Sequence, residues 1–156
     1  MATRFWSINT YRPSAVWIAA VAWLLYVISF FLPAVELGTS DQLEPGWKAA
    51  ATAGVALRVV VKYPAYDLMI VALWGLTNVL MVLSPVPIIR KWNARALNRA
   101  SLVMLMALGL NALALLDRRR HQLGVGYYLW LCAFGLVSLA FWVRSRTRCE
   151  SKAGQP

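Results

Sequence analysis

The chain has 156 residues, of which 60% are hydrophobic and only 14% are charged, and its mean hydropathy is +0.58. A soluble domain carries about 25% charged residues, and a small domain cannot hide so large an apolar excess in one core. The net charge of +10 would suit a nucleic-acid binder, but the basic residues stand between or beside long apolar runs. Composition therefore argues against nucleic acid as a partner and predicts a protein that has the lipid bilayer as its solvent.

Four apolar runs have about the length of membrane-spanning helices. At 1.5 Å per residue, about 20 residues cross a hydrocarbon core of about 30 Å. The runs cover residues 15–35, 68–89, 100–116 and 125–143, and the third is the shortest. The first run is too long for a signal peptide, and no small-residue cleavage site follows it. We therefore predict an all-α integral membrane protein with a four-transmembrane-helix bundle.

This bundle is expected to form a single membrane domain over residues 15–143. Residues 1–14 would form an N-terminal arm, and residues 144–156 a basic, disordered tail. Pro33 should close the first helix, and Pro85 and Pro87 should end the second, because proline lacks a backbone donor and clashes with the preceding turn.

The distribution of Lys and Arg predicts the orientation. The two ends of the chain and the loop after the second helix carry ten basic residues, whereas the opposite side carries six. Loops rich in Lys and Arg stay in the cytoplasm, so both termini are expected there, in a multi-pass protein of the inner membrane. The run Arg118, Arg119 and Arg120 opposes this assignment, because it would lie outside. Together with His121 it would suit an anionic headgroup, although a solvated charge run is the commoner meaning.

The first outer loop, residues 36–67, contains a candidate interfacial helix. Glu44, Lys48, Arg58 and Lys62 fall within one arc of a helical wheel, with small and apolar residues opposite. Such a helix would lie in the membrane interface or over the mouth of the bundle. The β-branched run near residue 60 leaves a strand as the alternative, and the charge arc favours the helix.

Few groups in this sequence are suited to chemistry. Thr77, Asn78 and Asn111 are the strongly polar residues inside the predicted spans, and we expect the two asparagines to bond across helices, with a substrate contact as the alternative. Cys132 and Cys149 form no redox or disulfide motif. No catalytic, phosphate-binding or metal-binding motif occurs, so we predict no catalytic residue, no metal site and no cofactor.

Small residues recur on the fourth predicted helix at Cys132, Gly135 and Ser138. A stripe of this kind lets two helices approach closely in lipid, where leaving water supplies no driving force. The stripe would serve packing within the bundle or contact with a partner protein.

Three short motifs resemble a loose group of short four-helix bacterial membrane proteins of unknown function. They are FLPA at residues 31–34, PGWKA at residues 45–49 and GYYLWL at residues 126–131. The matching positions are Pro33, Pro45, Gly46, Trp47, Gly126, Tyr127, Tyr128 and Trp130. The chain departs from the group in its longer first loop and in its arginine run, and the resemblance implies a layout but no activity.

In the predicted topology most of these positions lie at the outer end of the bundle. We expect an outer cap there, in which Trp47 packs against the start of the fourth helix. The cap would serve packing or, as the sharper hypothesis, a shallow site for a ligand or partner. We expect a non-enzymatic accessory or scaffold subunit that pairs with itself or another membrane protein. A small transporter or channel subunit that forms a pathway on oligomerisation is the alternative, and a lipid-acting enzyme ranks third.

Overall fold

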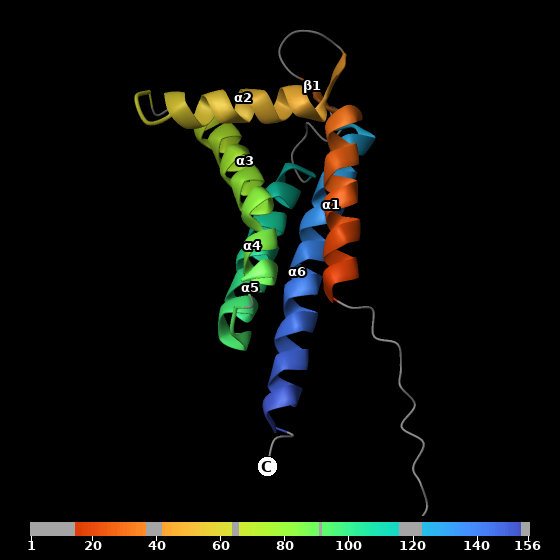
Figure 1. The fold of residues 1–156 in the computed structure, drawn as a ribbon. Helices are drawn as coiled ribbons and strands as arrows, with labels where there is room; N and C mark the ends of the chain where they lie inside the picture. Colours follow the sequence, from red (N-terminus) through yellow and green to blue (C-terminus); the bar gives the residue numbers. More distant parts are fainter. Residues whose placement is uncertain (1–14, 37–41, 64–65, 91, 116–122, 154–156) are drawn as a thin grey trace, which may run out of the picture.

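The computed structural model describes residues 15–36, 42–63, 66–90, 92–115 and 123–153, most of which are helical (Figure 1). The long helices are α1 (Ala15–Phe31), α3 (Tyr66–Leu83), α5 (Ala94–Ala112) and α6 (Val125–Ala153). They run alternately up and down, so the start of α1 and the end of α6 lie at the same end of the bundle (Figure 1).

The structure confirms the helical bundle. Two helical stretches, Met69–Ile89 and Val125–Thr147, are long and apolar enough to cross a membrane, and α1 is a shorter apolar helix. This finding rests on length and composition.

The second predicted helix departs from expectation at its prolines. After α3 the chain breaks at Ser84 and continues as the short helix α4 (Pro85–Ile89). The prediction that Pro85 and Pro87 end this helix is confirmed in part, because α3 ends at Leu83, before both prolines. Helical structure then resumes at once, since Pro85 occupies the first turn of α4, where its missing N–H would have no partner in any case.

The first and third helices also have other bounds than predicted. α1 ends at Phe31 rather than residue 35, because Pro33 turns the chain into an extended segment. α5 begins at Ala94 rather than residue 100, because the Asn93 side chain caps it by accepting a hydrogen bond from the backbone of Ala96 at 2.8 Å. A 3₁₀ turn, Leu113–Leu115, extends α5 at its other end.

The tail is the largest correction. α6 continues to Ala153, so residues 144–153 are helical rather than disordered. One contact from this extension is a hydrogen bond of 3.1 Å that Arg144 donates to the carbonyl oxygen of Ile88 in α4. Residues 154–156 lie outside the described part.

Two short strands, which the sequence analysis missed, join α1 to the next helix. β1 (Pro33–Glu36) pairs antiparallel with β2 (Leu43–Pro45), with Pro33 opposite Pro45. Val35 also bridges Leu123, directly before α6. The strands therefore tie the end of α1 to the start of α6.

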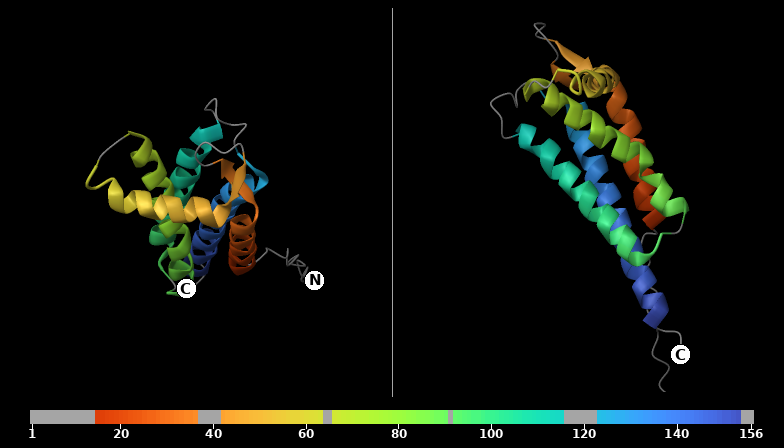
Figure 2. Two further views of the ribbon diagram at one scale, coloured as in Figure 1. Left: turned by 90° about the horizontal axis from the view of Figure 1, so that it is seen from above. Right: turned by 90° about the vertical axis from the view of Figure 1, so that its left-hand side faces the viewer.

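The predicted interfacial segment is helix α2 (Gly46–Val59), which lies crosswise over one end of the bundle (Figure 1, Figure 2). The strand alternative for this segment is wrong. Ala53 and Ala56 are buried on its lower face. A Cβ at Gly75 of α3 would lie 2.7 Å from the carbonyl oxygen of Ala53, so the two helices cross at very close range.

The core is centred on α6, which packs against α1 and α5. Its largest fully buried side chains are Phe134 and Phe141. Ser101 of α5 and Ser138 of α6 each donate a hydrogen bond of 2.9 Å to the other's carbonyl oxygen. Of the predicted small-residue stripe, Ser138 therefore packs within the bundle, whereas Cys132 is exposed.

Candidate functional site: a small cavity beneath α2

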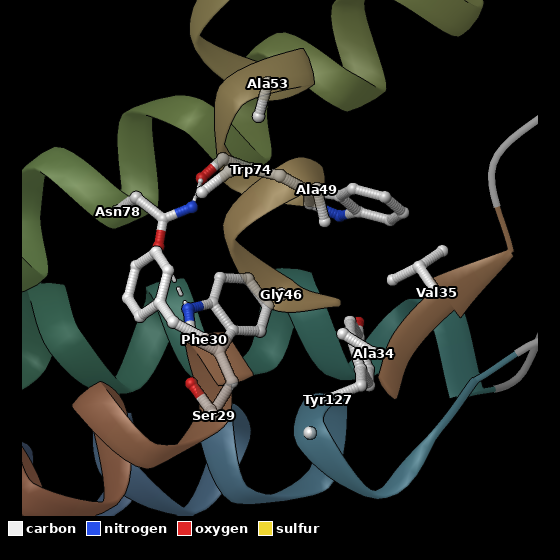
Figure 3. Close-up of a pocket in the computed structure, with 13 residues that line it drawn as sticks. Ser29, Phe30, Ala34, Val35, Gly46, Ala49, Ala53, Trp74, Asn78 and Tyr127 are labelled. Carbon is white, nitrogen blue, oxygen red and sulfur yellow. Dashed lines mark hydrogen bonds between the residues drawn. The ribbon is translucent and has the colours of Figure 1, made fainter. Parts of the chain in front are cut away.

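A small cavity lies under α2, where this helix meets the end of α1, the middle of α3 and the start of α6 (Figure 3). Its volume is about 40 Å³, enough for roughly one to three water molecules. This is the place where the sequence analysis expected an outer cap.

Asn78 of α3 is the polar centre of the cavity wall. Its Oδ1 accepts hydrogen bonds from the Tyr26 hydroxyl and from Nε1 of Trp130, both at 3.0 Å. Its Nδ2 donates to the carbonyl oxygen of Trp74 at 3.1 Å. One side chain thus connects α1, α3 and α6, which confirms the expected cross-helix bond at this position.

Aromatic rings surround this centre. Tyr26 meets Phe30 edge to face at 4.9 Å between ring centroids, and Tyr127 meets Trp130 at 5.4 Å. Trp74 lies 6.3 Å from Tyr127. Rings at these separations attract one another beyond the gain from burial, so these contacts stabilise an apolar wall around Asn78.

Two glycines allow the backbones to close around the cavity. A Cβ at Gly126 would lie 2.9 Å from the carbonyl oxygen of Leu32 and 3.0 Å from that of Ser29. A Cβ at Gly46 would strike the carbonyl oxygen of Ser29 more closely still. The backbone of Gly46 instead donates a hydrogen bond of 3.1 Å to Leu32. Both α2 and α6 therefore begin directly against the end of α1.

The lining residues limit the chemistry of this site. Among the described residues that line it there is no Asp, Glu, Lys, Arg, His or Cys. The one titratable hydroxyl, that of Tyr127, donates a hydrogen bond of 2.6 Å to the carbonyl oxygen of Asn111. In the described part of the chain, no group of three or more His, Cys, Asp and Glu side chains is placed to hold a metal ion. The cavity suits water or a small neutral group.

The structure brings together only part of the predicted outer cap. Gly46, Gly126, Tyr127 and Trp130 line the cavity, and Pro45 pairs with Pro33 beside it.

The expected packing of Trp47 against the start of the fourth helix is wrong. Trp47 is 52% exposed, and Ala49 of α2 packs instead against the cluster that contains Tyr127. Tyr128 is 46% exposed. Trp47 follows Gly46, and Tyr128 follows Tyr127, and in each pair the first residue lines the cavity. The second residue points outward, since neighbouring residues in a helix lie on different faces.

The other predicted polar residues have local partners. Thr77 donates to the carbonyl oxygen of Trp74, and Nδ2 of Asn111 donates to that of Ala107, each within its own helix. The expected cross-helix bond of the Asn111 side chain is therefore wrong. Its Oδ1 is buried and has no hydrogen-bond partner among the described residues.

The anion site expected at Arg118, Arg119, Arg120 and His121 lies outside the described residues. Sequence reasoning missed Tyr26 and Trp74, which supply a donor and an acceptor to Asn78. A tyrosine in the middle of an apolar run was the available signal for Tyr26, because a buried hydroxyl needs a partner.

No family model, curated protein or solved structure matches the chain. The resemblance to short bacterial membrane proteins stays a prediction.

Proposed function

We propose that this chain is an integral membrane protein in which α1, α3 with α4, α5 and α6 each cross the bilayer. The observation that supports this most strongly is an apolar surface that continues over all four helical units. Water-soluble monomers rarely expose apolar patches larger than a few hundred Å². The exposed side chains include Val21, Leu24, Val27 and Ile28 of α1, Leu76, Val79 and Val82 of α3, Leu102, Leu105, Met106 and Leu110 of α5, and Leu139 and Trp142 of α6.

Charge placement supports the same proposal. The described charged residues gather near the two ends of the bundle and leave its middle apolar. At the end where α1 begins they include Arg90, Arg95, Arg99, Arg144 and Arg146, and at the α2 end they include Glu36, Glu44, Lys48, Arg58 and Lys62. A bilayer requires this division, because a charge at its centre is costly.

In this proposal α2 lies in the membrane interface. Trp47 in the first turn of α2 and Tyr63 just beyond its end are exposed, with the ammonium groups of Lys48 and Lys62 at 5.8 Å and 5.5 Å from their respective ring centroids. Aromatic and basic side chains of this kind are typical of helices at the headgroup level.

Both termini would lie in the cytoplasm and the protein in the inner membrane, as the bias in Lys and Arg favours. The test is cysteine labelling in a background with Cys132→Ser and Cys149→Ser. We expect Ser40→Cys and His121→Cys to react with an impermeant reagent from outside, and Ser151→Cys to react from the cytoplasm. Labelling of His121→Cys from the cytoplasm alone would overturn the orientation.

As its role, we propose a non-enzymatic accessory or scaffold subunit of a membrane complex or homo-oligomer. The outward face of α5 supports this. A Cβ at Gly109 would have no neighbour within 4 Å, and Leu105, Met106 and Leu113 around it are exposed. A small residue among large ones lets a partner helix approach closely in lipid.

This role is tested by cross-linking in native membranes. Gly109→Cys should form a defined cross-linked species, with a second copy or with one membrane protein that mass spectrometry identifies. The matched control is Val27→Cys on the exposed face of α1, which should not form that species. Equal, non-specific products from both positions would contradict the proposed interface.

A transporter or channel subunit remains the second candidate, because Asn78 faces the cavity beneath α2. Its test is the permeability of reconstituted vesicles to protons and small solutes. The scaffold role predicts no protein-dependent flux, and hence no effect of Asn78→Ala. A flux that Asn78→Ala abolishes while the fold is retained would favour the pathway instead.

A further inference from the structure

A second and much larger hollow lies at the other end of the bundle, between α3 with α4 on one side and α5 on the other. This groove measures about 730 Å³, within the range of about 300–1,000 Å³ that is usual for ligand sites. The groove exists because α3 and α5 make few contacts with each other. α3 packs mainly against α2, and α5 packs mainly against α6. The small side chains of Ala96 and Ala100 on α5 leave it open.

The inner part of the groove is apolar. Leu80 and Leu83 line it from α3, Val103 and Met104 from α5, and Phe141 from α6. A hydrocarbon chain is the natural occupant of such a trough, because it removes apolar surface from contact with polar groups without leaving a hydrogen-bonding group unpaired.

The mouth of the groove is cationic. Arg95 and Arg99 line it from the first turns of α5, one helical turn apart and thus on the same face. Both are exposed, and within the described residues no acid forms an ion pair with either. The dipole of α5 adds positive potential at the same place, because its N-terminal end lies there.

We infer that this groove binds one anionic phospholipid, with its phosphate on Arg95 and Arg99 and an acyl chain between α3 and α5. The inference rests on the proposed membrane function. Two arginines that lack a described partner favour an anionic headgroup over a neutral one, since guanidinium groups bind phosphate oxygens in pairs. The apolar trough favours a lipid over free phosphate.

The bound lipid would have a structural effect. It would fill the space between two helices that otherwise make little contact, and so join α3 to the α5–α6 pair. The lipid is therefore expected to raise the stability of the folded protein by binding the native state alone.

The test uses the full chain in a neutral detergent, titrated with dioctanoyl phosphatidylglycerol, and thermal unfolding as the measurement. We expect saturable stabilisation by this lipid and a much weaker effect of dioctanoyl phosphatidylcholine. The double variant Arg95→Gln with Arg99→Gln should bind phosphatidylglycerol roughly 30-fold more weakly. Each cationic contact near a membrane surface raises the affinity for an anionic lipid by roughly fivefold, and the variant loses two of them. The matched control, Arg90→Gln with Arg146→Gln, removes the same charge at the same end and should keep the affinity of the unmodified chain.

A third variant, Ala100→Phe, fills the groove without changing charge and should also weaken binding. Equal stabilisation by both lipids, equal losses in the two double variants, or the same stabilisation by inorganic phosphate alone would each overturn the inference. These outcomes differ from failure of the membrane proposal, in which the chain would leave the membrane fraction in alkaline carbonate and stay soluble without detergent.

Discussion

The two buried asparagines illustrate how the same residue type plays different parts in one bundle. Asn78 accepts hydrogen bonds from Tyr26 and Trp130 on two other helices. Asn111 is more deeply buried, at 0% exposure, yet its side chain bonds only within α5. The degree of burial therefore does not indicate how much each asparagine contributes to stability. The number of hydrogen-bond donors that rely on its side chain does.

Replacing Asn78 should cost more than replacing Asn111. Asn78→Ala leaves the Tyr26 hydroxyl and the Trp130 indole without their acceptor, at a cost of about 1–3 kcal/mol. Asn111→Ala removes one bond within its own helix together with an acceptor that has no described partner, so about 1 kcal/mol or less is expected. Unfolding of the purified variants in mixed detergent micelles measures the difference, and equal losses would contradict the assignment of Asn78 as the connecting residue.

Glycine has two distinct uses along this chain. At Gly126 any side chain would collide with backbone oxygens of the turn that ends α1. At Gly109 the neighbouring space is empty. Gly126 is therefore required for packing, whereas the space beside Gly109 is free for another molecule.

These uses predict opposite effects of the same substitution. Gly126→Ala should destabilise by about 1–3 kcal/mol, because a fixed backbone cannot yield to the added methyl group. Gly109→Ala should stabilise the isolated protein by up to about 1 kcal/mol, since alanine is the better helix former. Thermal unfolding of both variants checks the signs. A stable Gly126→Ala protein would show that the α1 turn can move away.

Among the elements, α5 and α6 are joined in a way that needs small polar residues. Ser101 and Ser138 bond to each other's backbone, which is accessible only where two helices lie very close. By contrast, Ser145 of α6 donates to the carbonyl oxygen of Trp142 in its own helix. Ser138 and Ser145 are equally buried, at 6% exposure each.

That equality makes Ser145 a matched control for helix pairing. Ser138→Val should separate α5 from α6 and cost about 1–3 kcal/mol through overpacking and a lost interhelical bond. Ser145→Val should cost less, because it removes only a bond within α6. The measurement is unfolding together with a double-mutant cycle that includes Ser101→Ala; additive effects of Ser101 and Ser138 would contradict direct coupling.

At the scale of the whole molecule, four helical units alternate in direction and α2 covers one end (Figure 2). The units differ in length: α1 has 17 residues and reaches about 25 Å, a little less than a typical hydrocarbon core. In the proposed topology, local thinning of the bilayer accommodates this short span.

Amide hydrogen exchange in lipid nanodiscs tests this arrangement. The interior amides of α1, α3, α5 and α6 should exchange slowly, because both the helical hydrogen bonds and the lipid exclude water. Those of α2 should exchange faster, since in the proposed topology it lies at the interface with one face exposed. If α1 and α5 exchanged as fast as α2, they would not span the bilayer.

Several features of this protein followed from its amino-acid sequence alone. The length of the apolar runs predicts the helices of the bundle and the arc of charged residues predicts α2, and a cross-helix role for Asn78 was predictable as well. These features depend on local pattern and on the cost of burying polar groups, both of which the residues themselves carry.

Other features depended on which backbones come into contact. The bridge between Val35 and Leu123 and the hydrogen bond from Arg144 to Ile88 join segments far apart in the chain. The same holds for the donors that converge on Asn78 and for the groove beside Arg95. Only the tertiary structure decides these, because a close approach of two helices depends on both surfaces at once, whereas a sequence pattern describes one surface at a time.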